Sequence, residues 1–208
     1  MKNAAKCQMC DQPILEKILL GKVVALDVGH GWGNSALFDA GAIGNGRTEY
    51  ELNSLVAKKV AEILSTLGAK VHVFDYAPDT SERLFLNQKG KKAGEVKANV
   101  FVSIHHNAFN GTAQGTETLV HSLSTTLDEK LANCIQDQLV DKLKLTNRGI
   151  KERQLGVLKG CPTEIPACLT EAFFIDFFGL KNNIPEQLLE NEALGIALGI
   201  KDFLQMEK

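Results

Sequence analysis

Four separated stretches of the sequence each carry a histidine or a glutamate of the kind that binds metals or transfers protons. They are "LDVGHG" with His30, "GRTEYELN" with Glu49, "VSIHHNA" with His105 and His106, and "PACLTEAFF" with Glu171. Two neutral imidazoles and one carboxylate form a common ligand set for catalytic zinc, which leaves a fourth position for water. That water ionises near neutral pH and becomes a nucleophile, and a further carboxylate can take and return its proton.

Each of these residues also has a purely structural interpretation. A single histidine after a strand, such as His30, is more often hydrogen-bonded within the fold than bound to a metal. Glu49 alone would be a charge that the helix dipole stabilises at a helix N-terminus. Glu171 interrupts the apolar run "ACLTEAFFI", where a buried carboxylate is costly without a partner, so it favours a site more strongly. The functional interpretation depends on whether the four stretches converge.

The hydrophobic pattern predicts the elements that would bring them together. We expect strands in "KVVALDVGHG" and over 70–74, 99–104, 115–121, 154–158 and 167–175, and helices over 49–67, 80–97, 126–145 and 188–204. Strands that alternate with helices predict a single α/β domain whose sheet has helices on both faces. Ligands of such sheets collect outside the carboxyl ends of the strands. His30, His105 and Glu171 lie at or just past such ends, and Glu49 opens the helix after the first strand.

The adjacent histidines at 105 and 106 set a limit on the ligand set. Successive side chains of an extended strand point to opposite faces of the sheet. At most one of His105 and His106 is therefore a ligand, provided that the strand continues through both.

Composition excludes several classes of protein. The chain has 208 residues, 44% hydrophobic and 23% charged, which is ordinary for one soluble globular domain. The net charge of -2 and the sequence pI of about 6.2 provide no basic field for nucleic acid. No segment has the length of a membrane span. We therefore expect no nucleic-acid partner and no membrane span.

The five cysteines do not resemble a disulfide framework, because their number is odd and the chain is large. Cys7 and Cys10 form a C-x-x-C without a second ligand pair nearby, so an exposed pair without metal is favoured, and a zinc or redox role stays open. Cys161 and Cys168 lie in apolar or strand-like surroundings, where a thiol is usually inert. This context disfavours a cysteine hydrolase.

Taken in order, the four stretches resemble a known family. The order G-H-G, E-x-x-x-N, S-I-H-x-N and P-x-x-x-x-E-x-x-F is similar to that of the zinc-dependent N-acetylmuramoyl-L-alanine amidases of type 3, the AmiC/CwlV-like family. It is carried here by "DVGHGWG", "EYELN" (49–53), "SIHHNA" (103–108) and "PACLTEAFF" (166–174), and "DAGAIG" (39–44) looks like the loop between the first two. The resemblance runs from about Lys22 to near the C-terminus.

The resemblance implies a twisted, mostly parallel sheet and hydrolysis of the amide between N-acetylmuramic acid and L-alanine of the peptidoglycan stem peptide. Carried over by position, His30, Glu49 and His105 match the zinc ligands, and Glu171 matches the catalytic glutamate. Residues 1–21 would be a polar N-terminal lead, and residues 22–208 the amidase catalytic domain. The implied cofactor is zinc, and the implied partner is peptidoglycan, bound by a monomer.

The chain departs from the family pattern at several places, among them Gln154, which stands where asparagine is frequent. His106 replaces the small residue usual after the ligand histidine, so His106 and its neighbour Asn107 are rim or supporting residues rather than ligands. Trp32 follows G-H-G where glycine is frequent, and at a groove it would pack on a sugar or a peptide. The segment "KGKKAGEVKAN" has lysine and glycine where the family has an Arg…A-N pattern.

Some relatives carry an inhibitory helix after the third strand, where this chain has only "AFNGTAQ". Isolated helices shorter than about 12 residues are marginal, so this loop should leave the site open. We therefore expect activity without a protein activator.

Two other functions fit the same motifs. One is a zinc amidohydrolase or peptidase acting on a different amide, because the metal chemistry does not specify muramyl peptides. The other is a peptidoglycan-binding module without turnover, which has no need of a proton-transferring carboxylate such as Glu171. The N-terminal sequence has no apolar stretch of signal-peptide length. We therefore expect a protein that is cytoplasmic as made and acts on the cell wall after release, as a phage endolysin does; a shortened form of a secreted amidase is the alternative.

Overall fold

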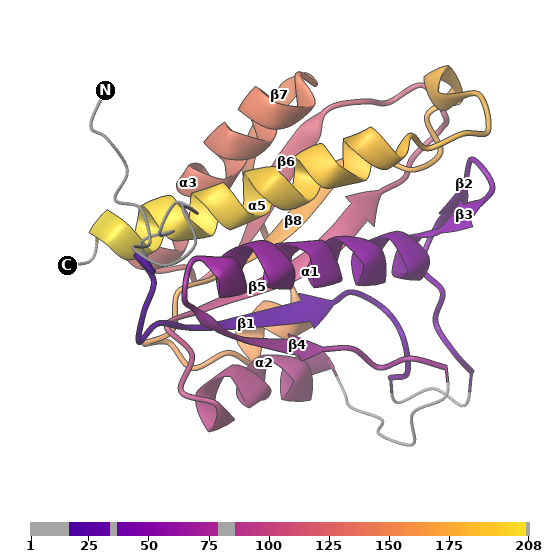
Figure 1. Ribbon diagram of the computed structural model, residues 1–208. Helices are drawn as coiled ribbons and strands as arrows, with labels where there is room; N and C mark the ends of the chain where they lie inside the picture. The colour runs from indigo at the N-terminus through magenta and orange to yellow at the C-terminus, as the bar shows by residue number, and fades with distance from the viewer. Residues whose placement is uncertain (1–16, 34–36, 79–85, 207–208) are drawn as a thin grey trace, which may run out of the picture.

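A six-stranded sheet forms the centre of the molecule (Figure 1). The computed structural model describes residues 17–33, 37–78 and 86–206, so Cys7 and Cys10 lie outside the described residues. The strands are β1 (Val23–Val28), β4 (Lys70–Phe74), β5 (Val100–Asn107), β6 (Thr116–His121), β7 (Asn147–Arg153) and β8 (Ala167–Phe174). Their order is β4-β1-β5-β8-β6-β7, and only the β6–β8 pairing is antiparallel. The predicted, mostly parallel sheet is confirmed.

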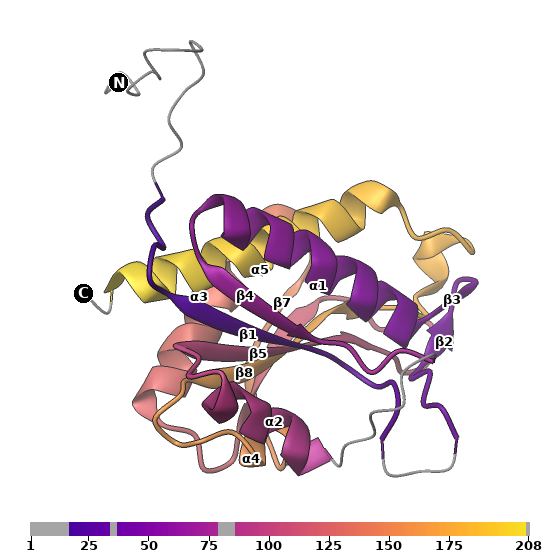
Figure 2. The ribbon, with the colours of Figure 1, turned by 60° about the horizontal axis from the view of Figure 1, so that its bottom comes forward.

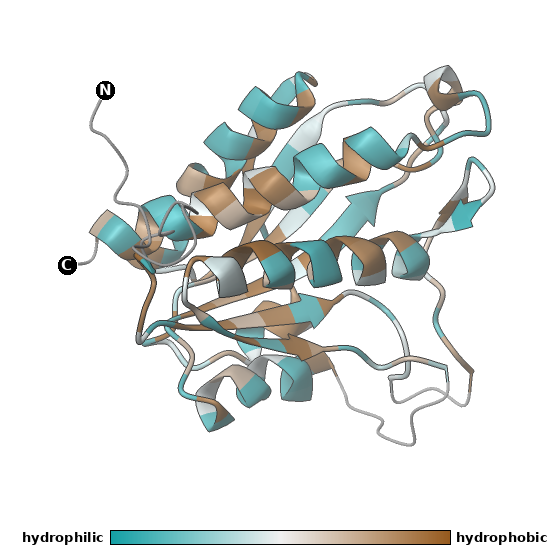
Figure 3. Ribbon diagram, viewed as in Figure 1, coloured by the Kyte–Doolittle hydropathy of each residue, from teal (hydrophilic) through white to brown (hydrophobic). Residues whose placement is uncertain are grey.

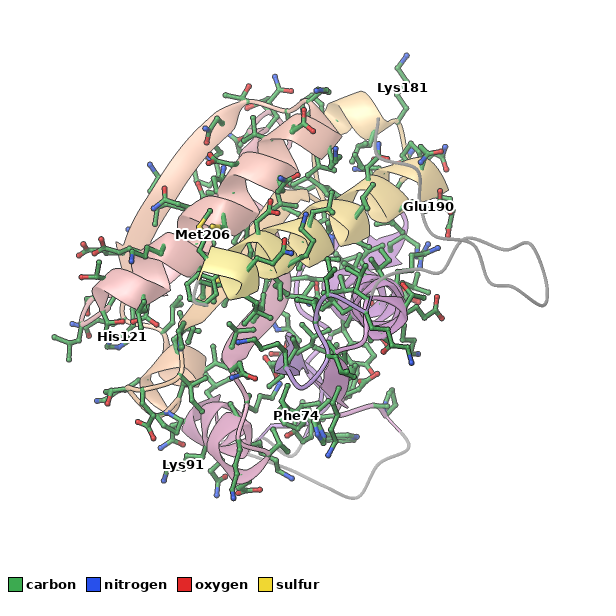
Figure 4. All side chains as sticks on the ribbon, turned by 60° about the vertical axis from the view of Figure 1, so that its left-hand side comes forward. Phe74, Lys91, His121, Lys181, Glu190 and Met206 are labelled. Atoms are coloured by element: carbon green, nitrogen blue, oxygen red, sulfur yellow. The ribbon has the colours of Figure 1, made fainter. Side chains whose placement is uncertain are left out.

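Helices cover both faces of the sheet, as predicted (Figure 2). One face carries α1 (Glu49–Thr66), α3 (Thr126–Leu143) and α5 (Glu186–Met206), and the other carries α2 (Leu86–Glu95) and the short α4 (Gly156–Lys159). Figure 3 shows apolar residues along the strands and on the inward sides of the helices. In Figure 4, Lys91 of α2 and Glu190 of α5 lie on opposite sides of the sheet. None of the helices in the described ranges is both long and apolar enough to cross a membrane.

The start of α1 is fixed by its own sequence. Thr48 accepts a hydrogen bond from the backbone N–H of Glu51, and the Glu51 carboxylate accepts one from the backbone N–H of Thr48, which is a complete capping box. The buried face repeats every four residues, at Leu52, Val56, Val60 and Leu64. This cap and this stripe together place Glu49 in the first turn, at the carboxyl end of the sheet.

The predicted strand over 154–158 is wrong. The strand in this region is β7, which ends at Arg153, and α4 follows it. β7 lies at the sheet edge and has the polar sequence "NRGIKER", so it lacks the apolar signal by which strands are recognised. Val157 and Leu158 are consecutive and both buried, which a helical turn permits and a half-buried strand does not.

Two further details affect the site. β5 continues through both histidines to Asn107, three residues beyond the predicted strand, and β8 bulges opposite its end, between the partners of His105 and Asn107. A short hairpin of β2 (Ile43–Gly44) and β3 (Arg47–Thr48) lies in the region expected to be a loop. Within the predicted lead, Leu19 is buried in the core.

Candidate metal centre and active site

Three of the predicted site residues converge at the carboxyl end of the sheet. One ligand atom from each of His30, Glu49 and His105 lies within 4.8 Å of the others. Glu49 is central: its Oε2 lies 2.9 Å from Nε2 of His30, and its Oε1 lies 2.9 Å from Nδ1 of His105. The loop after β1, the first turn of α1 and the end of β5 thus each supply one side chain to a single cluster.

Backbone groups fix the Glu49 carboxylate. The N–H of Ala42 donates to Oε2 at 3.0 Å, and the N–H of His106 donates to Oε1 at 3.1 Å. Burial opposes the charge of this carboxylate, but the hydrogen bonds from His105 and His30 outweigh burial and lower the pKa of Glu49 far below its usual value. Glu49 is therefore a fixed anion between two imidazoles.

His30 is held from its other side by Asp39, a residue to which the sequence had given no role. Asp39 Oδ2 lies 2.8 Å from Nδ1 of His30, so that Nε2 of His30 is directed at Glu49. Burial lowers the pKa of His30, but the bonds to Glu49 and Asp39 outweigh burial and raise it to about 9. A carboxylate on the far nitrogen is the usual means by which proteins orient a metal-binding histidine.

Glycines give the three side chains their space. His30 has a φ of 67°, which is uncommon for a residue other than glycine. A Cβ added at Gly29 would collide with the ring of His105, and one added at Gly41 would lie 2.6 Å from the ring of His30 and 2.8 Å from Oε2 of Glu49. These two positions require glycine because the ligand side chains occupy the space.

A buried lysine supports the backbone of His30. Lys89 on α2 donates from Nζ to the carbonyl oxygen of His30 at 2.6 Å, and its Nζ lies 3.6 Å from Oδ1 of Asp27. Ser103 donates to the other oxygen of Asp27 at 2.7 Å. Lys89 stands within the segment that departs from the family pattern, and it supplies a cation there.

Glu171 lies beside the cluster, and no side-chain hydrogen bond holds it within the described residues. It pairs with His105 across β5 and β8, and its Oε2 is buried with no hydrogen-bond partner in the described part of the chain. Burial, and secondarily the charges of Glu49 and Glu117, raise the pKa of Glu171 well above its usual value. A carboxyl with this environment is suited to accept and return a proton.

The expected rim residues occupy different places. His106 is buried on the opposite face from His105, with Nδ1 2.7 Å from Oδ1 of Asn53 and Nε2 2.9 Å from Oε2 of Glu192. Asn107 lies on the site face and donates from Nδ2 to Glu117 at 3.0 Å. Trp32 follows His30 in the chain and donates from Nε1 to the carbonyl oxygen of Pro78 at 3.1 Å. His106 is thus a core residue whose backbone, not its ring, supports the site.

The cysteines of the described chain do not form a nucleophilic centre. Cys161 and Cys168 are buried, and burial raises the pKa of the Cys161 thiol to about 12 and that of Cys168 further. Thiols of this kind are inert at neutral pH.

The cluster of His30, Glu49 and His105 has the donor atoms that zinc prefers, two imidazole nitrogens and a carboxylate oxygen. Asp39 orients His30, and a further carboxyl stands next to the cluster, that of Glu171, whose buried Oε2 has no hydrogen-bond partner among the described residues. The residues present therefore fit a catalytic zinc ion.

Comparison with known proteins agrees with this chemistry. Residues 24–201, which include all four predicted site residues, match the family described as N-acetylmuramoyl-L-alanine amidase. The chain belongs to this amidase family. It is 33% identical over 200 residues to the endolysin of Bacillus phage SPP1, covering 91% of this chain and 68% of the endolysin.

Two further relatives are bacterial. The chain is 34% identical over 163 residues to the N-acetylmuramoyl-L-alanine amidase LytC of Bacillus subtilis, covering 77% of this chain but only 31% of LytC. The crystal structure of an N-acetylmuramoyl-L-alanine amidase from Clostridium difficile 630 superimposes with a TM-score of 0.77 at 32% identity, covering 90% of this chain and 98% of that one. The fold seen here therefore accounts for nearly all of that amidase chain.

Proposed function

We propose that this amidase-family protein hydrolyses the amide between N-acetylmuramic acid and L-alanine of the peptidoglycan stem peptide, with zinc held by His30, Glu49 and His105. The observation that supports this proposal best is the convergence of these three donors beside Glu171, whose buried Oε2 has no hydrogen-bond partner in the described ranges. Bound in this cluster, zinc supplies Lewis-acid chemistry that polarises a carbonyl and acidifies a water molecule.

The protein's own groups perform the remaining work. Asp39 keeps Nε2 of His30 directed inward, and the N–H groups of Ala42 and His106 hold Glu49. Glu171 takes a proton from the attacking water as the new carbon–oxygen bond forms at the lactyl carbonyl. It then returns that proton to the L-alanine nitrogen as the carbon–nitrogen bond breaks, so the products are the muramic acid carboxylate and the peptide amine.

The substrate assignment is supported by the family match and by the similarity to the N-acetylmuramoyl-L-alanine amidase LytC. Cell-wall lysis as an endolysin is supported by the similarity to the SPP1 endolysin. In this proposal residues 22–208 are the catalytic domain, residues 1–16 are not required for catalysis, and the protein acts on the wall as a monomer without nucleic acid.

A digest of purified peptidoglycan tests the function directly. Mass analysis should find intact glycan strands and free stem peptides that begin with a new L-alanine amine. Cleavage within the peptide instead would indicate the alternative of a zinc peptidase, and binding to sacculi without release of fragments would indicate a non-catalytic module.

A further inference from the structure

The site face of the sheet continues beyond Glu171 into a second cluster. It consists of the polar residues Glu117, Arg148 and Asn107 and the ring of Phe174. In the register of the sheet, His105 pairs with Glu171, and Glu171 pairs with Glu117 on β6. Directly paired residues of neighbouring strands point to the same face. The carboxylate of Glu117 therefore lies one strand further out than that of Glu171, on the same surface.

Both carboxylate oxygens of Glu117 already accept hydrogen bonds. Asn107 donates from Nδ2 to Oε1 at 3.0 Å, and Arg148 donates from Nε to Oε2 at 2.7 Å. The residue is only 8% exposed. Its role is therefore to hold Arg148 and Asn107 rather than to receive a ligand.

Arg148, by contrast, has N–H donors that no acceptor among the described residues occupies. Its side chain is 38% exposed, and its guanidinium carbon lies 5.0 Å from the centre of the Phe174 ring. A guanidinium has five N–H donors in a rigid plane, and only the one on Nε has a hydrogen-bond acceptor among the described residues. The bond to Glu117 and the Phe174 ring fix the plane, which leaves the two Nη groups for an outside acceptor.

A bulge at the start of β7 places Arg148 in this arrangement. β7 shifts register against β6 at its start, because Thr116 pairs with Asn147 while Glu117 pairs with Gly149. Arg148 is the extra residue of this bulge. Bulges redirect a side chain relative to the regular strand pattern, and this one directs Arg148 toward Glu117 and the ring of Phe174 on β8.

We propose that Arg148 binds a free carboxylate of the departing peptide, two residues beyond the scissile amide; this inference rests on the proposed function. Neighbouring strands lie about 4.8 Å apart, so β7 is about 10 Å from β8. The guanidinium reaches back over Phe174 of β8, which shortens that distance. An extended peptide spans about 3.3–3.6 Å per residue. A carboxylate on the second residue after the scissile amide therefore comes within reach of the Arg148 guanidinium. The planar fork of arginine matches a carboxylate with two parallel hydrogen bonds.

The test uses two N-acetylmuramoyl tripeptides with an amidated C-terminus, in which the second residue is joined to the third through its side-chain carboxyl. The two probes differ only at the α-carboxyl of this second residue, which is either a free carboxylate or the corresponding carboxamide. Zinc-loaded wild-type protein should cleave the carboxylate probe with a kcat/KM about 10- to 100-fold higher, mostly through KM, because a charge-assisted hydrogen bond is lost with the amide. Arg148→Gln should remove this preference, because it should lower cleavage of the carboxylate probe about 10- to 100-fold more than cleavage of the carboxamide probe. Arg153→Gln, at the other end of the same strand, is the matched control and should retain the preference.

Each other result is decisive. Equal cleavage of the two probes by wild-type protein, or cleavage of sacculi without cleavage of either probe, overturns the carboxylate subsite while the amidase function stands. An equal loss on both probes in Arg148→Gln shows that Arg148 only holds Glu117, and it also overturns the subsite. Failure to cleave sacculi as well as both probes contradicts the proposed function itself. The wild-type comparison needs no variant, so it stays informative even if Arg148→Gln does not fold.

Discussion

Glu171 stands directly beside His105 in the parallel pairing of β5 and β8. His105 contacts Glu49 in the three-residue cluster, and Oε2 of Glu171 is buried without a hydrogen-bond partner in the part of the chain that the structure describes. This adjacency brings a proton carrier next to the groups proposed to hold zinc, although the two residues are 66 positions apart in the sequence.

Glu171→Gln should retain the fold and the zinc but lose activity on peptidoglycan by about 100- to 10,000-fold, the usual contribution of a general acid–base group. Zinc content and the circular dichroism spectrum check retention of the metal and the fold, and release of soluble peptide from sacculi measures the activity. Near wild-type turnover in this variant would remove Glu171 from the proton transfer.

The protein should contain about one zinc per chain at the cluster, and thorough chelation should abolish activity until zinc is restored. His30→Ala should lower the zinc affinity, measured by competition with a chromogenic chelator. A second zinc at Cys7 and Cys10 would raise the stoichiometry, so the count is repeated in the Cys7→Ser, Cys10→Ser variant. Full activity in protein free of metal contradicts the zinc mechanism.

The stability of the metal-free protein should fall as the pH rises from about 6.5 to about 9. The pKa of His30 is raised to about 9 by Glu49 and Asp39, so the folded state binds a proton that the unfolded chain releases near 6.5. A pKa that is higher in the folded state contributes its full stabilisation when the pH is below the unfolded-state pKa. This stabilisation is lost as the pH rises through the folded-state pKa. Urea unfolding in excess chelator measures this decrease.

His30→Gln serves as the control for that pH dependence and should flatten it across the same interval. An equally steep decrease in His30→Gln would assign the effect to another group.

Glu192→Ala should destabilise the protein by about 3–5 kcal/mol, because it leaves Nε2 of His106 without its partner in the core. Both side chains of this pair are 0% exposed, and Nε2 of His106 lies 2.9 Å from Oε2 of Glu192. Glu190→Ala, on the same helix, removes only a solvent-exposed contact with Lys59 and should cost less than about 1 kcal/mol. Denaturant unfolding of the zinc-loaded variants measures the free energy of unfolding of each. Similar decreases in the two variants would show that the buried pair stabilises the fold no more than the exposed one.

The purified protein should degrade isolated sacculi without any added activator. The segment 108–115 between β5 and β6 contains no helix, and Asp176 accepts hydrogen bonds from the N–H groups of Phe109 and Gly111, which fasten this loop to the end of β8. Removal of residues 1–16 should leave the activity unchanged; the cut stops before Leu19, which packs in the core. A silent full-length protein and an active shortened one would make the N-terminal segment an inhibitor.

The local sequence was sufficient to predict most of the helices and strands and to single out the four candidate site residues. Strong apolar periodicity marked β1, β4, β5 and β8 as well as the helices α1, α3 and α5. His30, Glu49, His105 and Glu171 lie in short motifs at the ends of these elements, so their types and order were already informative. The polar edge strand β7 was missed because an edge strand buries little and therefore needs no apolar alternation.

The supporting contacts depended on the tertiary structure. Asp39 meets His30 only because the loop after β1 folds back, and Lys89 reaches the His30 carbonyl only because α2 packs beneath β1. The clusters around Glu117 and His106 require β6 to lie beside β8, and α5 to cover β5. Periodicity reports which face of an element is buried, whereas strand order and helix packing decide which distant side chains meet. The sequence alone therefore determined which residues are candidates for the site, and the fold decided how these side chains are oriented.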